Sequence, residues 1–258
     1  MTPKEKSNYL KAFIELGIIW LKKPEASVEF DYLSKRVPNN FESFQFCYFP
    51  SYYDSMINFI DELSLIIKAD PIPILEELGI IYITEKYNKI VSFFKNNTAL
   101  IPFFDVYGNV KSISGRSLLP EEELKQRGLS KYKHLPFIKR NQLFGLNLSY
   151  IEILKKDKAV IVEGQIDFIS TYINGVKNST ALCGSKFTFE QIMLLKRFTN
   201  NFYLLLDNDE AGSDGFEKLN KSKAKYELNV FKLELPKEYH DVDDFVKNGN
   251  DLNSIIDI

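Results

Sequence analysis

Acidic residues follow three apolar stretches of this chain, and they are its clearest sign of chemistry. The stretches are residues 160–162, 202–206 and 230–235. The acids that follow them are Glu163 and Asp167, Asp207 and Asp209, and Asp241 and Asp243. Short apolar, β-branched runs predict buried strands. Ligands bind beyond the carboxyl ends of the strands in an open α/β sheet, so the spacing predicts one acidic site at one edge of a sheet.

Carboxylates in this arrangement suit a hard divalent cation. Mg²⁺ usually keeps several waters and binds through one or two carboxylates together with substrate phosphates. Asp207 and Asp209 can both turn toward one ion where the strand ends, and Glu163 can complete the site or move protons. A second ion, as in two-metal phosphoryl transfer, has three further acids: Asp167, Asp241 and Asp243. Acids also favour loops and helix N-termini, an alternative that explains Glu210 better than it explains three strand ends.

The composition describes a globular chain with a basic segment. Of its 258 residues 45% are hydrophobic and 14% aromatic, and the formal net charge is −2. That average argues weakly against nucleic-acid binding. However, residues 111–158 hold 11 Lys and Arg against 5 Asp and Glu. A basic segment beside an acidic metal site suits an enzyme that handles phosphates.

Other features narrow the class of protein. No apolar run approaches the roughly 20 residues of a membrane span, and the start does not read as a signal peptide, so we expect a cytoplasmic protein that does not bind membranes. The two cysteines, Cys47 and Cys183, are too few for a tetrahedral zinc site, so we expect no zinc in this chain. The abundance of Lys, Asn and Ile is compatible with a phage- or plasmid-encoded origin.

Apolar periodicity and turn residues predict the elements before the acidic motifs. Helices are expected over residues 6–21, 25–36 and 72–78, the last closed by Gly79. Strands are expected over residues 80–83, 90–94, 100–106 and 110–114. The aromatic residues of 41–60 are expected to pack as core, although such residues also form stacking platforms for single strands. A charged join at residues 155–157 predicts a domain boundary.

The acidic motifs resemble those of the Toprim domain, which primases, topoisomerases and several nucleases share. The matching stretches are VEGQID, LLLDNDEAG and HDVDDF, in this order and spacing. Three further stretches resemble the bacterial-type DNA primase in particular: TALCGSKFTFEQIMLLKRFTNNFYLLLDNDEAG between the motifs, and PFFDVYGNVKSISGR and SKYKHLPFIKRNQLFGL before them.

The resemblance implies an α/β fold in two parts. A mixed α/β lobe with a basic face would cover residues 1–157, and a Toprim domain with a Rossmann-like, mostly parallel sheet flanked by helices would cover residues 158–258. It implies a nucleotidyltransferase that makes RNA primers from ribonucleoside triphosphates on a single-stranded DNA template, with Mg²⁺ or Mn²⁺. Two alternatives stay open: a Toprim-type nuclease acting on RNA or DNA, and a nucleic-acid-binding Toprim protein without catalysis.

The resemblance also implies roles for particular residues. Catalytic and metal-binding roles fall on Glu163, Asp207 and Asp209, and further metal-binding roles on Asp167, Asp241 and Asp243. Nucleotide or nucleic-acid contacts fall on Lys95, Arg116, Lys131, Lys139 and Arg140. The family usually carries arginines just before residues 100–104, where this chain offers only the charge of Lys95. His240, beside the third acidic motif, is interpreted as a bystander.

Primases of this family ordinarily place a zinc module before the catalytic core and a helicase-binding module after it. This chain starts in a core-like helix and ends soon after the third acidic motif. We therefore expect a zinc-bearing template-recognition protein or a replicative helicase to act in trans. Phosphate-binding lysines do not read bases, so the chain alone should bind single strands weakly, with little sequence preference.

Overall fold

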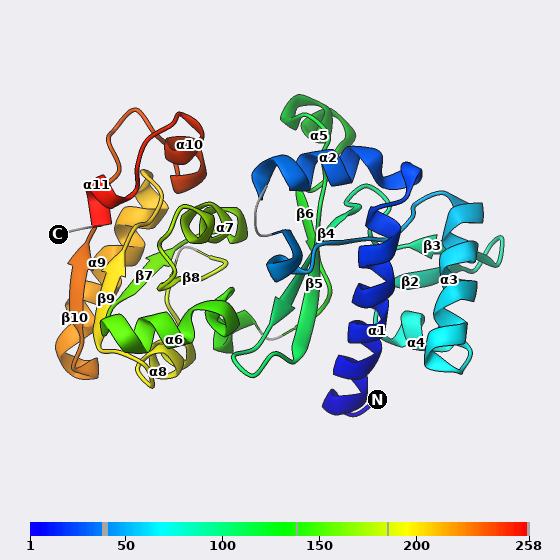
Figure 1. Cartoon of the computed structure of the whole chain (residues 1–258), viewed down its shortest axis with the longest axis horizontal. Helices are drawn as coiled ribbons and strands as arrows, with labels where there is room; N and C mark the ends of the chain where they lie inside the picture. Colours follow the sequence, from blue (N-terminus) through cyan, green and yellow to red (C-terminus); the bar gives the residue numbers. More distant parts are fainter. Residues whose placement is uncertain (38–40, 138, 185, 257–258) are drawn as a thin grey trace. The chain divides into compact units, whose positions relative to one another are not determined.

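The computed structural model describes residues 1–37, 41–137, 139–184 and 186–256, and the chain divides into two compact units (Figure 1). The first unit contains Met1–Phe103 and Asn109–Phe137, and the second contains Phe104–Gly108 and Ile138–Ile258. This division differs from the boundary expected at residues 155–157. The reason is that α6 (Leu146–Lys156) packs against strand β8 (Ser179–Ala181) of the second unit.

The first unit combines helices with two small sheets. Its helices are α1 (Pro3–Leu21), α2 (Ser27–Arg36), α3 (Tyr53–Ile67), α4 (Pro71–Glu77) and α5 (Glu121–Arg127), with 3-10 turns at Pro24–Ala26 and Phe41–Phe44. Its strands are β1 (Cys47–Tyr48), β2 (Ile81–Thr84), β3 (Lys89–Ser92), β4 (Ala99–Phe104), β5 (Val110–Arg116) and β6 (Tyr132–His134). One sheet has the order β1-β4-β5-β6, and β2 and β3 form an antiparallel pair.

Helix α1 lies against the larger sheet of this unit at unusually short range. A Cβ on Gly17 would meet Cys47 Cβ at 2.9 Å and the Tyr48 carbonyl oxygen at 3.0 Å, so only glycine permits this approach. On the same helix, Phe13 packs against the rings of Phe49 and Phe59, each with its centroid 5.2 Å away. The aromatic residues before and within α3 are therefore partly core, as expected, although no helix was predicted over residues 53–67.

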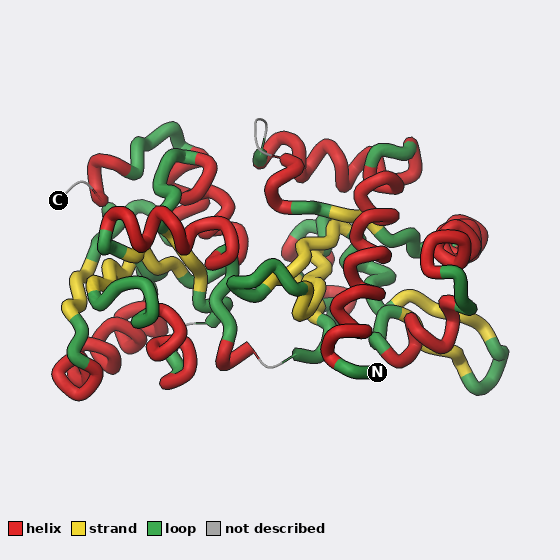
Figure 2. Tube along the Cα trace, turned by 60° about the horizontal axis from the view of Figure 1, so that its bottom comes forward, coloured by secondary structure: helices red, strands yellow, loops and turns green. Residues whose placement is uncertain are grey.

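The second unit contains a parallel sheet between helices (Figure 2). Its strands are β7 (Ala159–Val162), β8 (Ser179–Ala181), β9 (Asn201–Leu204) and β10 (Asn229–Lys232). Its helices are α6, α7 (Gln165–Ile173), α8 (Phe189–Leu195), α9 (Glu210–Tyr226), α10 (Val242–Lys247) and α11 (Asn253–Ile256), and a 3-10 turn spans Lys139–Asn141. The strand order is β10-β9-β7-β8, with every neighbouring pair parallel.

This strand order explains why residues 160–162 are apolar without alternation. All four residues of β7 are buried, as strands covered on both faces must be. Ala159 and Ile161 join a core cluster with residues of α6, α8 and α9. The order also reverses between β7 and β9, because the chain first adds β8 on one side of β7 and then β9 on the other. Such a switch point is where ligands bind in open α/β sheets.

The elements agree with most of the sequence predictions. The helices expected at 6–21, 25–36 and 72–78 are α1, α2 and α4, and Gly79 has the left-handed φ of +75°. The last strand is shorter than expected, because β10 ends at Lys232 and a loop covers residues 233–240 before Asp241. Among the described residues, no helix is both long enough and apolar enough to cross a membrane.

Candidate metal centre

Glu163 and Asp207 come together at the switch point of the sheet. Glu163 directly follows β7, and Asp207 follows β9, whose Leu204 pairs with Ile161 of β7. The backbone of Asp207 favours the ionised form of the Glu163 carboxyl and so lowers its pKa, although burial has the larger, opposite effect. Gly212, in the first turn of α9, allows this approach, since a Cβ there would lie 2.3 Å from the Asp207 carbonyl oxygen and 3.0 Å from Glu163 Oε1.

Both carboxylates keep one buried oxygen without a hydrogen-bond partner. These atoms are Oε1 of Glu163 and Oδ1 of Asp207. Burial, reinforced by the charges of Asp209 and Asp167, raises the pKa of Glu163 to about 7. Burial also raises the pKa of Asp207 to about 8, with the neighbouring carboxylates adding to it. A buried, unpaired carboxylate oxygen is costly, and a bound cation would offset that cost.

Asp209 lies beside this pair but has a structural task as well. Its Oδ1 accepts a hydrogen bond from the Gly212 N–H at 2.8 Å, so it is the N-cap of α9. The side chain is exposed, and its charge contributes to the raised pKa of both Glu163 and Asp207. One carboxylate oxygen of Asp209 is therefore explained by its role as a helix N-cap, without any metal.

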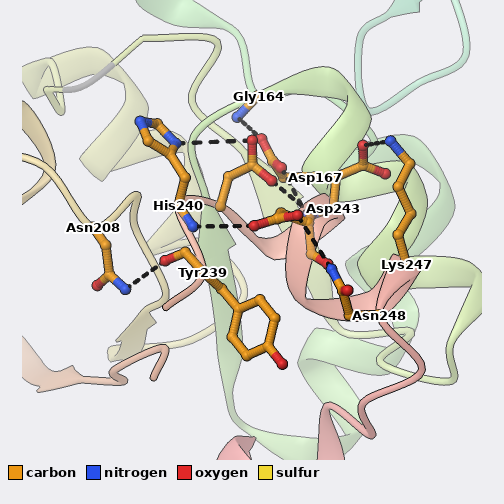
Figure 3. A network of polar contacts seen from close by, with 10 residues as sticks. Gly164, Asp167, Asn208, Tyr239, His240, Asp243, Lys247 and Asn248 are labelled. Carbon is orange, nitrogen blue, oxygen red and sulfur yellow. Dashed lines mark hydrogen bonds and ion pairs between the residues drawn. The ribbon is translucent and has the colours of Figure 1, made fainter. Parts of the chain in front are cut away.

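Asp167 and Asp243 face each other between α7 and α10 (Figure 3). Asp167 accepts hydrogen bonds from the N–H of Gly164 at 3.1 Å and from the N–H of Asp243 at 3.3 Å. Asp243 accepts from Ser170 Oγ at 2.7 Å and is paired with Lys247 at 2.5 Å. Burial, followed by the charge of Asp241, raises the pKa of Asp167 to about 6. Both acids are thus engaged within the protein.

The loop after β10 brings Asp241, the last of the predicted metal ligands, to the same edge of the parallel sheet. Asn208 holds this loop: its backbone N–H donates to the His240 carbonyl at 2.8 Å, and its side-chain amide donates to the Tyr239 carbonyl at 2.8 Å (Figure 3). Asp241 is the N-cap of α10 and accepts from the Asp244 N–H at 2.7 Å. The ring of His240 lies 3.9 Å from Asp241, and its side chain is 66% exposed. That His240 is a bystander stays a prediction.

These residues fit a cation that takes few protein ligands. Within the described ranges, no three His, Cys, Asp or Glu side chains are arranged as they stand to hold a metal ion. Mg²⁺ and Mn²⁺ take oxygen ligands, and Mg²⁺ often uses only one or two carboxylates, with waters and phosphates completing the shell. The unpartnered oxygens of Glu163 and Asp207 match that requirement.

A cavity of about 230 Å³ opens beside this pair, in the second unit. Asp207 and Asp209 line one part of it, and Lys232 and Lys237 line another. The sequence patterns singled out neither lysine, because neither belongs to the motifs or to the basic segment. The cavity offers space next to the carboxylates for a polar ligand.

The basic residues expected to bind nucleotides are divided between the two units. Arg116 pairs in register with Tyr132 on β6, contacts its hydroxyl, and lies over its ring at 5.1 Å. Lys131 is exposed, and its carbonyl accepts from the N–H of Ser117, next to Arg116. Lys95 is exposed in the same unit. The structure thus brings Arg116 and Lys131 together.

The other two basic residues belong to the second unit. Arg140 is exposed and lies 3.5 Å from Glu190. Lys139 begins a 3-10 turn, and its side chain lies outside the described residues. An aromatic partner that the sequence patterns missed is Tyr32 of the first unit, whose ring stacks with Arg116 at 5.4 Å. Arg116 and Tyr32 are far apart in the sequence, so the local sequence around either residue does not predict that they stack.

The raised pKa values predict how the metal-free stability of the chain depends on pH. The ordinary values of these carboxyls lie near 4, so between about pH 4 and 8 the folded chain binds more protons than the unfolded chain, and stability must fall as pH rises. We expect the metal-free Tm to fall by about 2–6 °C between pH 5 and 8 through this effect. Thermal unfolding in EDTA at a series of pH values measures this change in Tm, with Asp207→Asn as the control. An equally steep profile in that variant would contradict the assignment.

Comparisons with known proteins agree with this geometry. Residues 160–246 match a family model described as Toprim-like. They form a Toprim-like domain. The match begins at Val160 in β7 and ends at Val246 in α10, and it includes Glu163, Asp207 and Asp243.

The similarity extends beyond the Toprim-like domain. A DNA primase of Synechococcus elongatus is 30% identical over 207 residues, which are 77% of this chain but 28% of that protein. The crystal structure of the Aquifex aeolicus primase, with zinc-binding and RNA polymerase domains, matches 96% of this chain and 59% of its own, with 25% identity and a TM-score of 0.76. A DnaG primase catalytic domain bound to ssDNA matches 93% of this chain and 78% of its own, at 22% identity and a TM-score of 0.73.

The chain as a whole therefore resembles the catalytic core of bacterial-type DNA primases. The expected fold class, a Toprim sheet preceded by a mixed α/β lobe, is confirmed. The matched stretch spans less than a third of the length of the Synechococcus relative.

Proposed function

We propose that this chain is a primase-type nucleotidyltransferase, which synthesises RNA primers from ribonucleoside triphosphates on single-stranded DNA. The observation that carries the proposal is the pair of buried, unpartnered oxygens on Glu163 and Asp207, at the switch point of a Toprim-like sheet. The similarity to primases and to a primase domain bound to ssDNA supports the choice of substrate.

Glu163 and Asp207 would hold a Mg²⁺ or Mn²⁺ ion, with Asp209 beside them. When bound, such an ion activates the attacking 3′-hydroxyl and stabilises the charge of the leaving pyrophosphate. Asp207 lines the cavity in which phosphate oxygens can complete the coordination. In the first unit, Arg116 and Lys131 carry cationic groups, which form the stronger class of hydrogen bond with phosphate oxygens.

Three outcomes of one experiment separate the functions that share this site. The purified chain is incubated with ribonucleotides, a labelled single-stranded template and Mg²⁺ or Mn²⁺. Template-dependent RNA oligomers would establish the primase. A shortened template would establish a nuclease instead, and a shifted band without either product would establish a binding protein. For selective starts on the template we propose a partner in trans, either a zinc-bearing protein or a replicative helicase that raises the local template concentration.

Arg116→Ala and Lys131→Ala should weaken nucleotide use more than template binding. Losing one charge-assisted contact should raise KM for ribonucleotides by roughly tenfold. Binding of a single strand should lose only about 0.7 from its log–log salt slope, because one phosphate contact is removed. The matched control is Lys125→Ala, an exposed lysine paired with Glu121 on α5, which should change neither. An equal loss of nucleotide and DNA affinity would mark Arg116 and Lys131 as general surface charge.

A further inference from the structure

Lys247 forms an ion pair with Asp243, a carboxylate that the acidic motifs predicted as a metal ligand. Its Nζ lies 2.5 Å from Oδ2 of Asp243, one turn earlier in α10. The other oxygen of Asp243 is used as well, because Ser170 Oγ of α7 donates to Oδ1 at 2.7 Å. The ammonium and the hydroxyl thus hold the two sides of this carboxylate within the protein. Figure 3 shows the contact between Lys247 and Asp243.

The surroundings make this ion pair stronger than an ordinary surface pair. The side chain of Asp243 is only 13% exposed, whereas that of Lys247 is 55% exposed. Surface ion pairs contribute little because water and salt screen them, but a carboxylate largely removed from water needs a nearby positive charge or hydrogen bonds to remain ionised. Lys247 therefore acts as a resident cation at this end of the acidic site.

Among the residues that the structure describes, no ion pair of this kind neutralises Glu163 and Asp207, at the other end of the acidic site. Glu163 and Asp207 each keep a buried oxygen without a partner, so a cation can bind there without breaking a contact that involves those atoms. A cation that used Asp243 would first have to displace an ammonium group. One half of the acidic site is available, and the other half is already neutralised by the chain's own charge.

We propose that Lys247 competes with a divalent cation for Asp243. The chain then holds one Mg²⁺ or Mn²⁺ ion at Glu163 and Asp207, and it binds a second ion weakly until the ammonium leaves Asp243. Lys247 is in this sense a positioning residue that sets the affinity for the second ion. The inference rests on the proposed metal-dependent function.

Counting bound Mn²⁺ tests this proposal without any measurement of activity. The electron paramagnetic resonance signal of free Mn²⁺ during a titration gives the number of bound ions and their affinities. In Lys247→Met we expect the weaker class of ions to bind roughly three- to tenfold more tightly, the equivalent of losing one partly screened ion pair. The stronger class should change by less than about twofold at physiological salt.

Two controls separate competition at Asp243 from a general change in charge. Lys237→Met removes a positive charge that lines the cavity beside Asp207 and Asp209, and it should alter both classes equally and by less than about twofold. Asp243→Asn should cancel the gain in the Lys247→Met background, as expected for two groups that interact directly. Lys247→Gln, which keeps a hydrogen-bond donor near Asp243, should show a smaller gain and guards against a folding defect in the Met variant.

Each result bears on the proposal in a defined way. Unchanged Mn²⁺ binding in both Lys247 variants would overturn it, as would an equal gain in Lys237→Met. A gain that persists after Asp243→Asn would also overturn it, because the carboxylate would not be the contested ligand. If the wild-type chain binds no Mn²⁺ at all, the proposed metal-dependent function fails first, and this inference falls with it.

Discussion

Asp207→Asn should abolish primer synthesis while the chain stays folded. Among the described residues, Asp207 offers one of the two buried carboxylate oxygens without a partner, and an amide oxygen carries no charge to hold a divalent ion. A metal ion contributes several kcal/mol to stabilising charge in the transition state, and about 4 kcal/mol corresponds to roughly a 10³-fold loss of kcat. Rates of primer synthesis with Mg²⁺ and with Mn²⁺ measure the loss.

The same variant should be more stable than the wild-type chain without metal. Burial and the neighbouring carboxylates raise the pKa of Asp207 to about 8, so its ionised form opposes folding at neutral pH. Replacing it with a neutral side chain should raise the metal-free Tm by about 2–4 °C, which is about 1 kcal/mol, a small gain because solvent screens part of the repulsion.

Glu210→Gln provides the matched control for both measurements. Glu210 is exposed in the first turn of α9, next to Asp209, and the same charge is removed there without touching the buried pair. We expect nearly normal synthesis and an unchanged Tm. Near-normal synthesis by Asp207→Asn would show that Asp207 is not a metal ligand, and a lower metal-free Tm would show that its carboxylate stabilises the fold instead.

Gly212→Ala should damage both the stability and the site. A Cβ at this position would lie 2.3 Å from the carbonyl oxygen of Asp207. A backbone atom cannot rotate away as a side chain can, so the start of α9 must move. Overpacking of this kind costs about 1–3 kcal/mol, or roughly 2–10 °C in Tm at this chain length. A displacement of about 1 Å at reacting groups can cost about 10²-fold in rate.

Gly184→Ala is the comparison for this variant. Gly184 also lies in the Toprim-like domain, but a Cβ there would meet nothing within 4 Å. Thermal unfolding and primer synthesis should both stay close to the wild type. If Gly212→Ala behaves in the same way, the close approach of α9 to Glu163 and Asp207 does not matter for the site.

The sequence by itself determined where the acids lie relative to the strands. Residues 160–162 and 202–206 are apolar because both faces of the central strands are covered, and this requirement leaves a pattern that can be read without a structure. Glu163 and Asp207 then follow at the strand ends, where parallel neighbours bring them to one edge. Family resemblance added the order of the motifs, and the fold confirmed it.

The last strand is shorter than the sequence patterns predicted, and the chain divides into units at residues other than 155–157. Leu233 and Leu235 continue the apolar pattern of the expected strand, yet β10 ends at Lys232, and both leucines are buried in the loop that follows. An apolar run indicates that residues are buried, but it does not indicate where strand pairing stops. The end of β10 therefore could not be predicted from the local sequence. The boundary shifted because α6 is amphipathic like any surface helix, and only its contacts show which unit it covers.

Only the tertiary structure decided which acids are available to a cation. Asp167 and Asp243 look equivalent to Glu163 and Asp207 in the motifs, but the N–H of Asp243 reaches Asp167 across 76 positions of the chain. Ser170 and Lys247 then engage Asp243 itself. Residue type and spacing report which side chains lie near a strand end. Whether a carboxylate oxygen has a partner depends on donors supplied by distant segments, and those are brought to it only by folding.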